Sequence, residues 1–173
     1  MRRLATFALI LFCAASASAK PKPDKLTKQF LGVWRLAAIE SQPPGRPDFY
    51  VKPTGVIFYD PSGWMSVQIA NKSDRKPFAT FLADARTATL EAKAAAYDSY
   101  LAYYGTFTVD AKSQTVTHHL EDYSFPGRRG TDNVRWFEFQ GANRLVLTPV
   151  EDGKGGVLDR KDAKYKLIWE RVK

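Results

Sequence analysis

Short runs of alternating apolar and polar residues, separated by turn residues, make up most of the chain from residue 32 onward. The alternation has the period of two that a half-buried β-strand shows, and many short strands with frequent turns are typical of a barrel or sandwich. The segment Asp60-Pro61-Ser62-Gly63 places proline and glycine where a tight turn favours them. We expect eight strands, over 32–40, 54–59, 63–69, 103–109, 114–121, 133–139, 144–150 and 164–172.

One segment has a different period. The alanine-rich stretch 85–102 spaces Leu90, Ala94, Tyr97 and Leu101 four, three and four residues apart, which puts them on one face of a helix. The pattern therefore predicts an all-β, antiparallel up-and-down barrel with one helix inserted between the third and fourth strands. We expect this helix to lie on the barrel or across one of its ends.

The alternation also predicts which side chains face the barrel lumen. Successive side chains of a strand point in and out by turns, and successive strands run in opposite directions. Trp34 begins the first strand and Arg171 ends the last, so both belong at one end of the barrel. The predicted lumen is mainly apolar and includes Phe107, Val116, Leu120, Phe137, Phe139, Leu145, Leu147 and Trp169. Its polar members gather toward the opposite end and comprise Tyr103, His118, Arg135 and Tyr165, with Gln68 as a further candidate.

The N-terminus has the order of a secretory signal peptide. Arg2 and Arg3 precede an apolar run over 4–15, and Ala17-Ser18-Ala19 is a small-residue cleavage site. The apolar run is too short to span a membrane as a helix. We expect a signal peptide over 1–19, an extended leader over 20–28, one barrel domain over 29–173, and a periplasmic or secreted protein.

Composition and charge exclude several kinds of chemistry. The single cysteine, Cys13, lies in the predicted signal peptide, so neither disulfides nor thiolate chemistry is expected. The formal net charge of +8 comes from scattered residues, which favours solubility and weak attraction to anionic envelope surfaces over nucleic-acid binding. His118 and His119 point to opposite faces of a strand, so they cannot chelate one metal ion together. We expect no metal, no cofactor and no nucleophile-elbow serine.

Several motifs resemble known families. Gly32-Val33-Trp34 and Trp169-Glu170-Arg171 resemble the lipocalin and wider calycin pattern, which implies that Trp34 seals the closed end and Arg171 packs over it. The segments 101–110, 115–121 and 144–149, with Phe125-Pro126 and Gly130-Thr131-Asp132, look like the bacterial and fungal lipocalin-like domain family. That resemblance covers nearly all of the expected mature chain and implies a calycin barrel.

An apolar cup with a few convergent polar groups is typical of a small-molecule site. We therefore expect an exported protein that binds a small, mainly apolar ligand carrying a polar or anionic group. Arg135, His118 and Tyr103 are expected to meet the polar group, and Phe107, Phe137 and Phe139 to contact the apolar body. Two alternatives stay open: an isomerase or cyclase with His118 as general base and Arg135 as enolate stabiliser, and an envelope scaffold whose barrel is filled by its own side chains.

Overall fold

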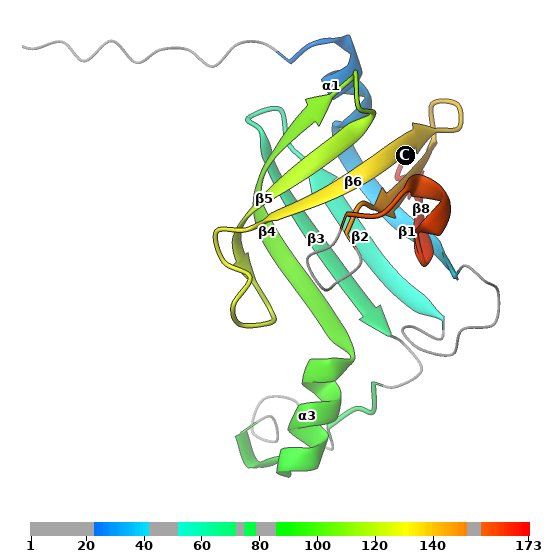
Figure 1. Cartoon of the computed structure of the whole chain (residues 1–173). Helices are drawn as coiled ribbons and strands as arrows, with labels where there is room; N and C mark the ends of the chain where they lie inside the picture. Colours follow the sequence, from blue (N-terminus) through cyan, green and yellow to red (C-terminus); the bar gives the residue numbers. More distant parts are fainter. Residues whose placement is uncertain (1–22, 42–51, 72–74, 79–85, 152–156) are drawn as a thin grey trace, which may run out of the picture.

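The computed structural model describes residues 23–41, 52–71, 75–78, 86–151 and 157–173. Eight antiparallel strands form one closed barrel in which each strand pairs with the next and β8 returns to β1 (Figure 1). The predicted eight-stranded barrel is confirmed, with strand ends displaced by a few residues. The strands are β1 (Gly32–Ser41), β2 (Pro53–Tyr59), β3 (Trp64–Asn71), β4 (Tyr100–Asp110), β5 (Thr115–Tyr123), β6 (Asp132–Phe139), β7 (Arg144–Pro149) and β8 (Tyr165–Arg171).

A short helix, α1 (Lys25–Phe30), precedes the first strand. The prediction of an extended leader over 20–28 is therefore wrong from Lys25 onward; residues 20–22 lie outside the described part. The physical reason is a cap that composition alone does not reveal: an Asp24 carboxylate oxygen accepts a hydrogen bond from the Thr27 amide at 2.6 Å, which satisfies one of the free amides at a helix start. Phe30, the last residue of the helix, lies fully buried in the end of the barrel.

The inserted helix, α3 (Leu90–Asp98), is shorter than predicted. A Thr89 hydroxyl caps it by accepting a hydrogen bond from the Ala92 amide at 3.2 Å. The chain then enters β4, so Leu101 belongs to a strand. None of the helix residues is buried, and Leu90 is 80% exposed.

The expectation that this helix lies on the barrel or across one of its ends is also wrong. α3 projects away from the open end (Figure 1), and Tyr97 connects it to the loop between β5 and β6. The Tyr97 hydroxyl donates a hydrogen bond to the Ser124 carbonyl at 2.7 Å, and its ring meets the Phe125 ring edge-on at 5.4 Å. Of the four residues predicted to share the helix's apolar face, Leu101 lies in β4, Leu90 is exposed, and Ala94 offers little area to bury.

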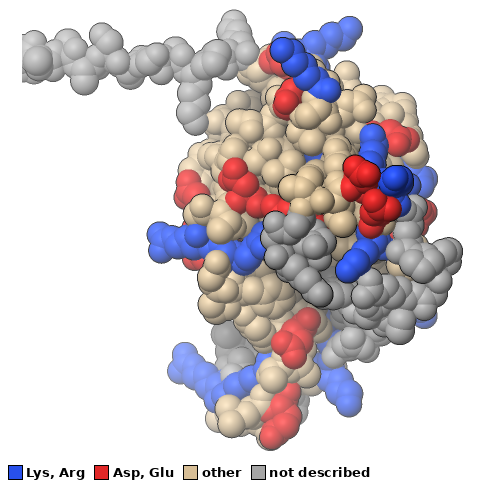
Figure 2. Space-filling model, viewed as in Figure 1, with Lys and Arg blue, Asp and Glu red and all other residues tan. Residues whose placement is uncertain are grey.

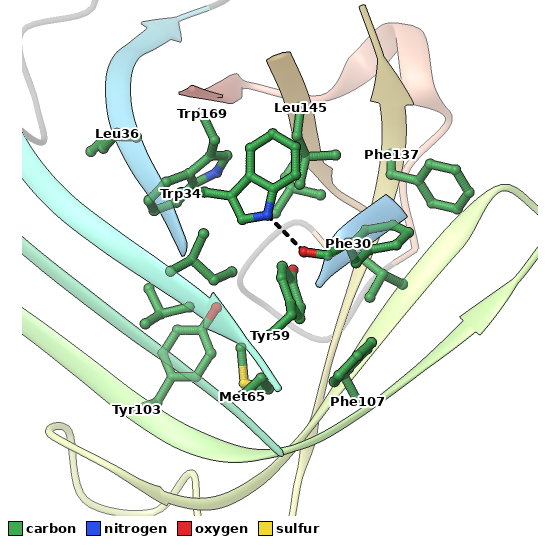
Figure 3. Packing of buried hydrophobic residues seen from close by; sticks show 14 of the residues in the cluster. Phe30, Trp34, Leu36, Tyr59, Met65, Tyr103, Phe107, Phe137, Leu145 and Trp169 are labelled. Atoms are coloured by element: carbon green, nitrogen blue, oxygen red, sulfur yellow. Dashed lines mark hydrogen bonds between the residues drawn. The ribbon is translucent and has the colours of Figure 1, made fainter. Parts of the chain in front are cut away.

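Aromatic side chains fill the closed half of the barrel (Figure 3). The Phe30 ring makes edge-to-face contacts with Tyr59, Phe137 and Phe139, with ring centroids 4.9–5.4 Å apart. Trp34 is fully buried, and its indole N–H donates to the Phe30 carbonyl at 2.7 Å. Helix α1 is thus part of the core and closes this end of the barrel.

Arg171 completes the closure from the last strand. Trp34 and Arg171 are direct partners in the β1–β8 register, and the guanidinium carbon lies 4.0 Å from the centroid of the Trp34 ring. The same guanidinium donates hydrogen bonds to the carbonyls of Gln29, Leu31 and Ala142 at 2.6–3.0 Å. The predicted meeting of Trp34 and Arg171 is confirmed.

A β-bulge between β4 and β5 changes which side chains enter the lumen. The register shifts between Tyr104 and Gly105, so Gly105 faces Leu120 whereas Tyr103 faces Tyr123. Glu121 is the extra residue. Strict alternation would send Tyr123 outward with the odd-numbered residues of this strand, and the bulge turns it inward instead.

Candidate functional site

A buried histidine held between two tyrosines occupies the middle of the lumen. The Tyr59 hydroxyl lies 2.8 Å from His118 Nε2, and the Tyr103 hydroxyl lies 3.1 Å from His118 Nδ1. His118 is fully buried, and the two tyrosines are 2% and 7% exposed. The three residues come from β5, β2 and β4, so the closed barrel is what brings them together.

Burial dominates the ionisation of this cluster. Removal from water, with a smaller contribution from Arg135, holds the pKa of His118 well below its ordinary value of 6.5. The same cause raises the pKa of Tyr103 to about 12 and that of Tyr59 well above 10. At neutral pH the cluster is uncharged, and either imidazole tautomer accepts from one phenol and donates to the other.

His118 therefore has no free ring nitrogen for a ligand. Alternation along the strand predicts His118 near the open end, as a ligand contact or a possible general base. The structure places it deeper and gives both nitrogens a partner, so it orders the interior of the barrel.

Two arginines lie toward the open end. Arg135 lies on the inner face of β6, between the buried side chains of Asn133 and Phe137. Arg128 reaches in from the loop between β5 and β6 and donates a hydrogen bond to the Asn133 side-chain oxygen. Both guanidinium charges act on the phenols of Tyr103 and Tyr123 and oppose the rise that burial imposes on their pKa values.

The tyrosines of this region form a platform. The Tyr103 and Tyr123 rings stack with centroids 5.2 Å apart and an interplanar angle of 4°. The Arg128 guanidinium lies 5.9 Å from the Tyr123 centroid. Tyr165, at the start of β8, is 40% exposed.

The two arginines of this region carry more N–H donors than the described structure pairs: Arg128 donates to the Asn133 side-chain oxygen, and Arg135 donates to the Val134 carbonyl at 2.9 Å. Within the described residues, neither Arg128 nor Arg135 lies within 4.0 Å of a carboxylate oxygen. In this region the buried Arg128 Nε–H lacks a hydrogen-bond partner among the described residues; the other such donor, Trp169 Nε1–H, lies in the closed half beside Trp34 (Figure 3). Buried donors normally have an acceptor. A molecule that pairs with the unpaired N–H would therefore carry a hydrogen-bond acceptor or an anionic group.

The apolar residues predicted to contact a ligand lie in the filled half of the barrel. Phe137 and Phe139 pack against Phe30 and against each other. Phe107 packs edge-on against Tyr59 at 4.8 Å. All three face inward as predicted, and their described neighbours are other core side chains.

Gln68 does not join the lumen. Met65, Val67 and Ile69 are the buried residues of β3, so Gln68 points outward. Its side-chain oxygen accepts a hydrogen bond from the Tyr100 hydroxyl at 3.2 Å in an exposed position. The prediction that placed Gln68 with the polar lumen residues is wrong, because the strand's alternation assigns position 68 to the outer face.

Comparison with known proteins settles the family. The model of a lipocalin-like domain matches residues 31–172. The chain belongs to the lipocalin-like domain family. A solved structure of a redesigned β-barrel is similar over 85% of this lipocalin-like chain and 95% of its own length, at 9% identity and a TM-score of 0.44. No curated protein matches.

Sequence reasoning missed three residues of this lipocalin-like site. Tyr59 belongs to the continuous apolar run Val56-Ile57-Phe58-Tyr59, where alternation cannot decide between the faces. Tyr123 enters through the bulge, for which Gly105 inside a strand pattern was the available signal. Arg128 comes from a loop, where neither a period of two nor one of 3.6 applies.

Other features of the lipocalin-like barrel are weaker candidates for a functional site. A surface hollow of about 510 Å³ lies at the closed end, lined by Gln29, Phe139, Gly141, Ala142, Asn143 and Arg171. Its one charged group, Arg171, is already bonded to three carbonyls. Among the described residues, no group of three or more His, Cys, Asp or Glu side chains is placed to hold a metal ion. The described helices include none long and apolar enough to cross a membrane.

Proposed function

We propose that this lipocalin-like barrel binds a small amphipathic molecule that carries an anionic or strongly accepting group. The observation that supports this best is the surplus of donors toward the open end. The Arg128 guanidinium lies 5.9 Å from the centroid of the Tyr123 ring, Arg135 lies on the inner face of β6, and neither has a carboxylate partner in the described structure. A half-buried guanidinium is stable when an acceptor meets its fixed donors, and a carboxylate does so with two parallel hydrogen bonds.

The arrangement of the lumen suggests how the ligand would lie. The closed half is occupied by Phe30, Trp34 and their aromatic neighbours, so the ligand would be short and held in the open half. Its acidic group would meet Arg135 and Arg128. Its apolar part would contact the rings of Tyr103, Tyr123 and Tyr165, whose hydroxyls add further polar partners.

Displacement of a fluorescent probe tests this proposal. Anilinonaphthalene sulfonate would be displaced by decanoate or cinnamate, and each acid would be compared with its neutral alcohol, decanol or cinnamyl alcohol. We expect the acids to bind more tightly than the alcohols. Arg135→Ala should lower the affinity for the acids about ten- to a hundredfold, as the loss of hydrogen bonds to a charged group implies. The affinity for the alcohols should stay nearly unchanged.

Two variants serve as controls. Arg135→Lys keeps the charge and loses the planar fork, so it should recover only part of the acid affinity. Arg35→Ala removes the same charge from an exposed position on β1 and should have little effect. Equal weakening by Arg35→Ala would mean that only net charge attracts the acids, and the proposed site would be wrong.

A filled barrel is the second candidate function. The packing of Phe30 against Tyr59, Phe137 and Phe139 favours a scaffold role, because these rings occupy space that a larger ligand would need. If no acid or alcohol displaces the probe, and native mass spectrometry of the exported protein finds no retained molecule, the scaffold function replaces the binding function.

We also propose that the protein acts in the periplasm or outside the cell. The basic, apolar and small-residue order of positions 2–19 supports this; these positions lie outside the described residues. The intact mass of the exported protein should correspond to a chain that begins at Lys20. On the face shown in Figure 2, basic and acidic side chains are interspersed, so attraction to anionic envelope surfaces would be weak and sensitive to salt.

A further inference from the structure

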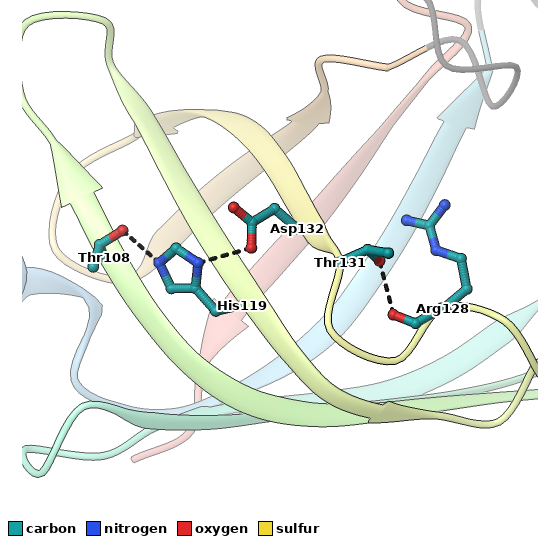
Figure 4. A network of polar contacts seen from close by, with 5 residues as sticks. All are labelled: Thr108, His119, Arg128, Thr131 and Asp132. Atoms are coloured by element: carbon teal, nitrogen blue, oxygen red, sulfur yellow. Dashed lines mark hydrogen bonds and ion pairs between the residues drawn. The ribbon is translucent and has the colours of Figure 1, made fainter.

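Three polar side chains form a continuous relay on the outer face of the barrel, away from the lumen (Figure 4). His119 Nδ1 lies 2.8 Å from an Asp132 carboxylate oxygen, and His119 Nε2 lies 2.9 Å from the Thr108 hydroxyl. The residues belong to β5, β6 and β4, which are adjacent strands.

The sheet register produces this arrangement. His119 and Asp132 are direct cross-strand partners, and His119 pairs on its other side with Thr106, two residues from Thr108. Direct partners on one face stand about 5 Å apart at their Cβ atoms, and diagonal neighbours are within reach of a ring. The relay is therefore fixed by backbone pairing on both sides of the imidazole.

The protonation of the relay follows from its acceptor end. An ionised carboxylate only accepts hydrogen bonds, so Nδ1 of the neutral imidazole carries the hydrogen and donates it to Asp132. Nε2 then holds a lone pair and accepts a hydrogen bond from the Thr108 hydroxyl. This is the direction in which a proton leaves a hydroxyl that attacks an electrophile.

Structural need does not account for the relay. The side chains of His119 and Asp132 are 39% and 53% exposed, and Thr108 is exposed. Water would satisfy the same polar groups at these positions, so the bonds between them add little to stability. Their exposure also leaves the hydroxyl accessible to a molecule from solution.

We propose that Thr108, His119 and Asp132 form a surface acyl-transfer site that acts on small activated esters. Thr108 Oγ1 attacks the acyl carbon as its proton passes to His119 Nε2, and an oxygen–carbon bond forms. The bond from that carbon to the leaving alcohol or phenol breaks, and the imidazolium returns the proton to the leaving oxygen. Water, activated by the same nitrogen, then releases the acid and restores the Thr108 hydroxyl.

Hydrolysis of p-nitrophenyl acetate by the full exported chain tests this site. We expect nitrophenol release above the rate in buffer, and an acetyl group on Thr108 when the reaction is quenched in acid and the peptides are analysed by mass spectrometry. Thr108→Val and His119→Gln should each lower the rate about a hundredfold, the lower end of what a positioned general base contributes. Asp132→Asn should also lower the rate, because the imidazole tautomer is no longer fixed. The decrease should be smaller than in the other two variants, because the hydroxyl and the imidazole are both still present.

Matched variants separate this mechanism from nonspecific reaction with the reagent. Thr117→Val removes an outward hydroxyl from the residue paired with Thr108 and should leave the rate unchanged, whereas Thr108→Ser should retain the activity. If Thr108→Val reacts as fast as the unmodified chain, or if acetyl is found on lysines or His119 and not on position 108, the proposal is wrong. These outcomes are independent of ligand binding in the lumen.

Discussion

At the scale of single residues, the two histidines show how strongly position governs chemistry. His118 and His119 are neighbours in sequence, yet one is fully buried between two phenols and the other lies exposed beside a carboxylate. The alternation of a strand alone assigns them to opposite faces. One imidazole therefore belongs to the core, and the other is accessible from solution.

The buried imidazole should couple energetically to both tyrosines. Tyr59→Phe and Tyr103→Phe each remove one hydrogen bond and leave a ring nitrogen of His118 without a partner, so each should cost about 1–3 kcal/mol in the free energy of unfolding. Urea denaturation measures these costs. Because both phenols bond to the same imidazole, the double variant should be non-additive. Strict additivity would mean that the two hydrogen bonds do not share His118.

The pH dependence of stability follows from the same burial. The folded state keeps His118 neutral with a pKa well below 6.5, whereas the unfolded chain takes up a proton near that value. Stability should therefore fall as the pH drops below about 6.5, at up to about 1.4 kcal/mol per pH unit from this one group. His118→Gln should remove that component, as measured by urea denaturation between neutral and mildly acidic pH. An unchanged slope in the variant would show that His118 is not the source.

At the scale of secondary-structure elements, the bulge at Gly105 turns the Tyr123 side chain toward the lumen at the open end. A Cβ atom at this position would collide with the His119 carbonyl oxygen of the neighbouring strand. Gly105→Ala should therefore cost about 2–4 kcal/mol, in the range of substitutions that strain a packed backbone. It should also disturb the Tyr103–Tyr123 stack, which near-ultraviolet circular dichroism would detect.

Gly141→Ala is the matched control for this change. Gly141 has a positive φ of 70°, but an added Cβ would meet nothing within 4 Å. It should cost only about 1–2 kcal/mol, from the left-handed backbone conformation. Equal costs at the two positions would contradict a specific close approach at Gly105.

The sequence predicted elements well where one face of a strand is clearly apolar. Alternation placed Val116, His118 and Leu120 of β5 correctly, because Thr115, Thr117 and His119 mark the other face. In β2 both faces are apolar, so alternation cannot distinguish the inner face from the outer one. It also has no means of showing that the helix before β1 inserts Phe30 into the barrel. Prediction of the site was weaker, since the bulge and the loop that bring in Tyr123 and Arg128 depend on contacts between distant parts of the chain.

At the scale of the whole molecule, Trp34 and Arg171 join the first strand of the barrel to the last. Trp34→Ala should cost about 3–5 kcal/mol, as expected for a large buried aromatic residue. Arg171→Ala should cost less, because its side chain is only partly buried. The double variant should be non-additive, because the guanidinium lies against the indole ring. Strict additivity in chemical denaturation would contradict this contact.

The pairing of β1 with β8 also has a consequence for how the protein folds. The first strand gains its second neighbour only when the last strand arrives, and contacts so far apart in sequence are associated with slow folding. Until then the inner surface around Trp34 is open to water and to other chains. If the chain crosses the membrane unfolded and N-terminus first, barrel closure must wait until residue 171 has crossed the membrane. The emerging chain would therefore depend on chaperones that shield its aromatic surface during the delay.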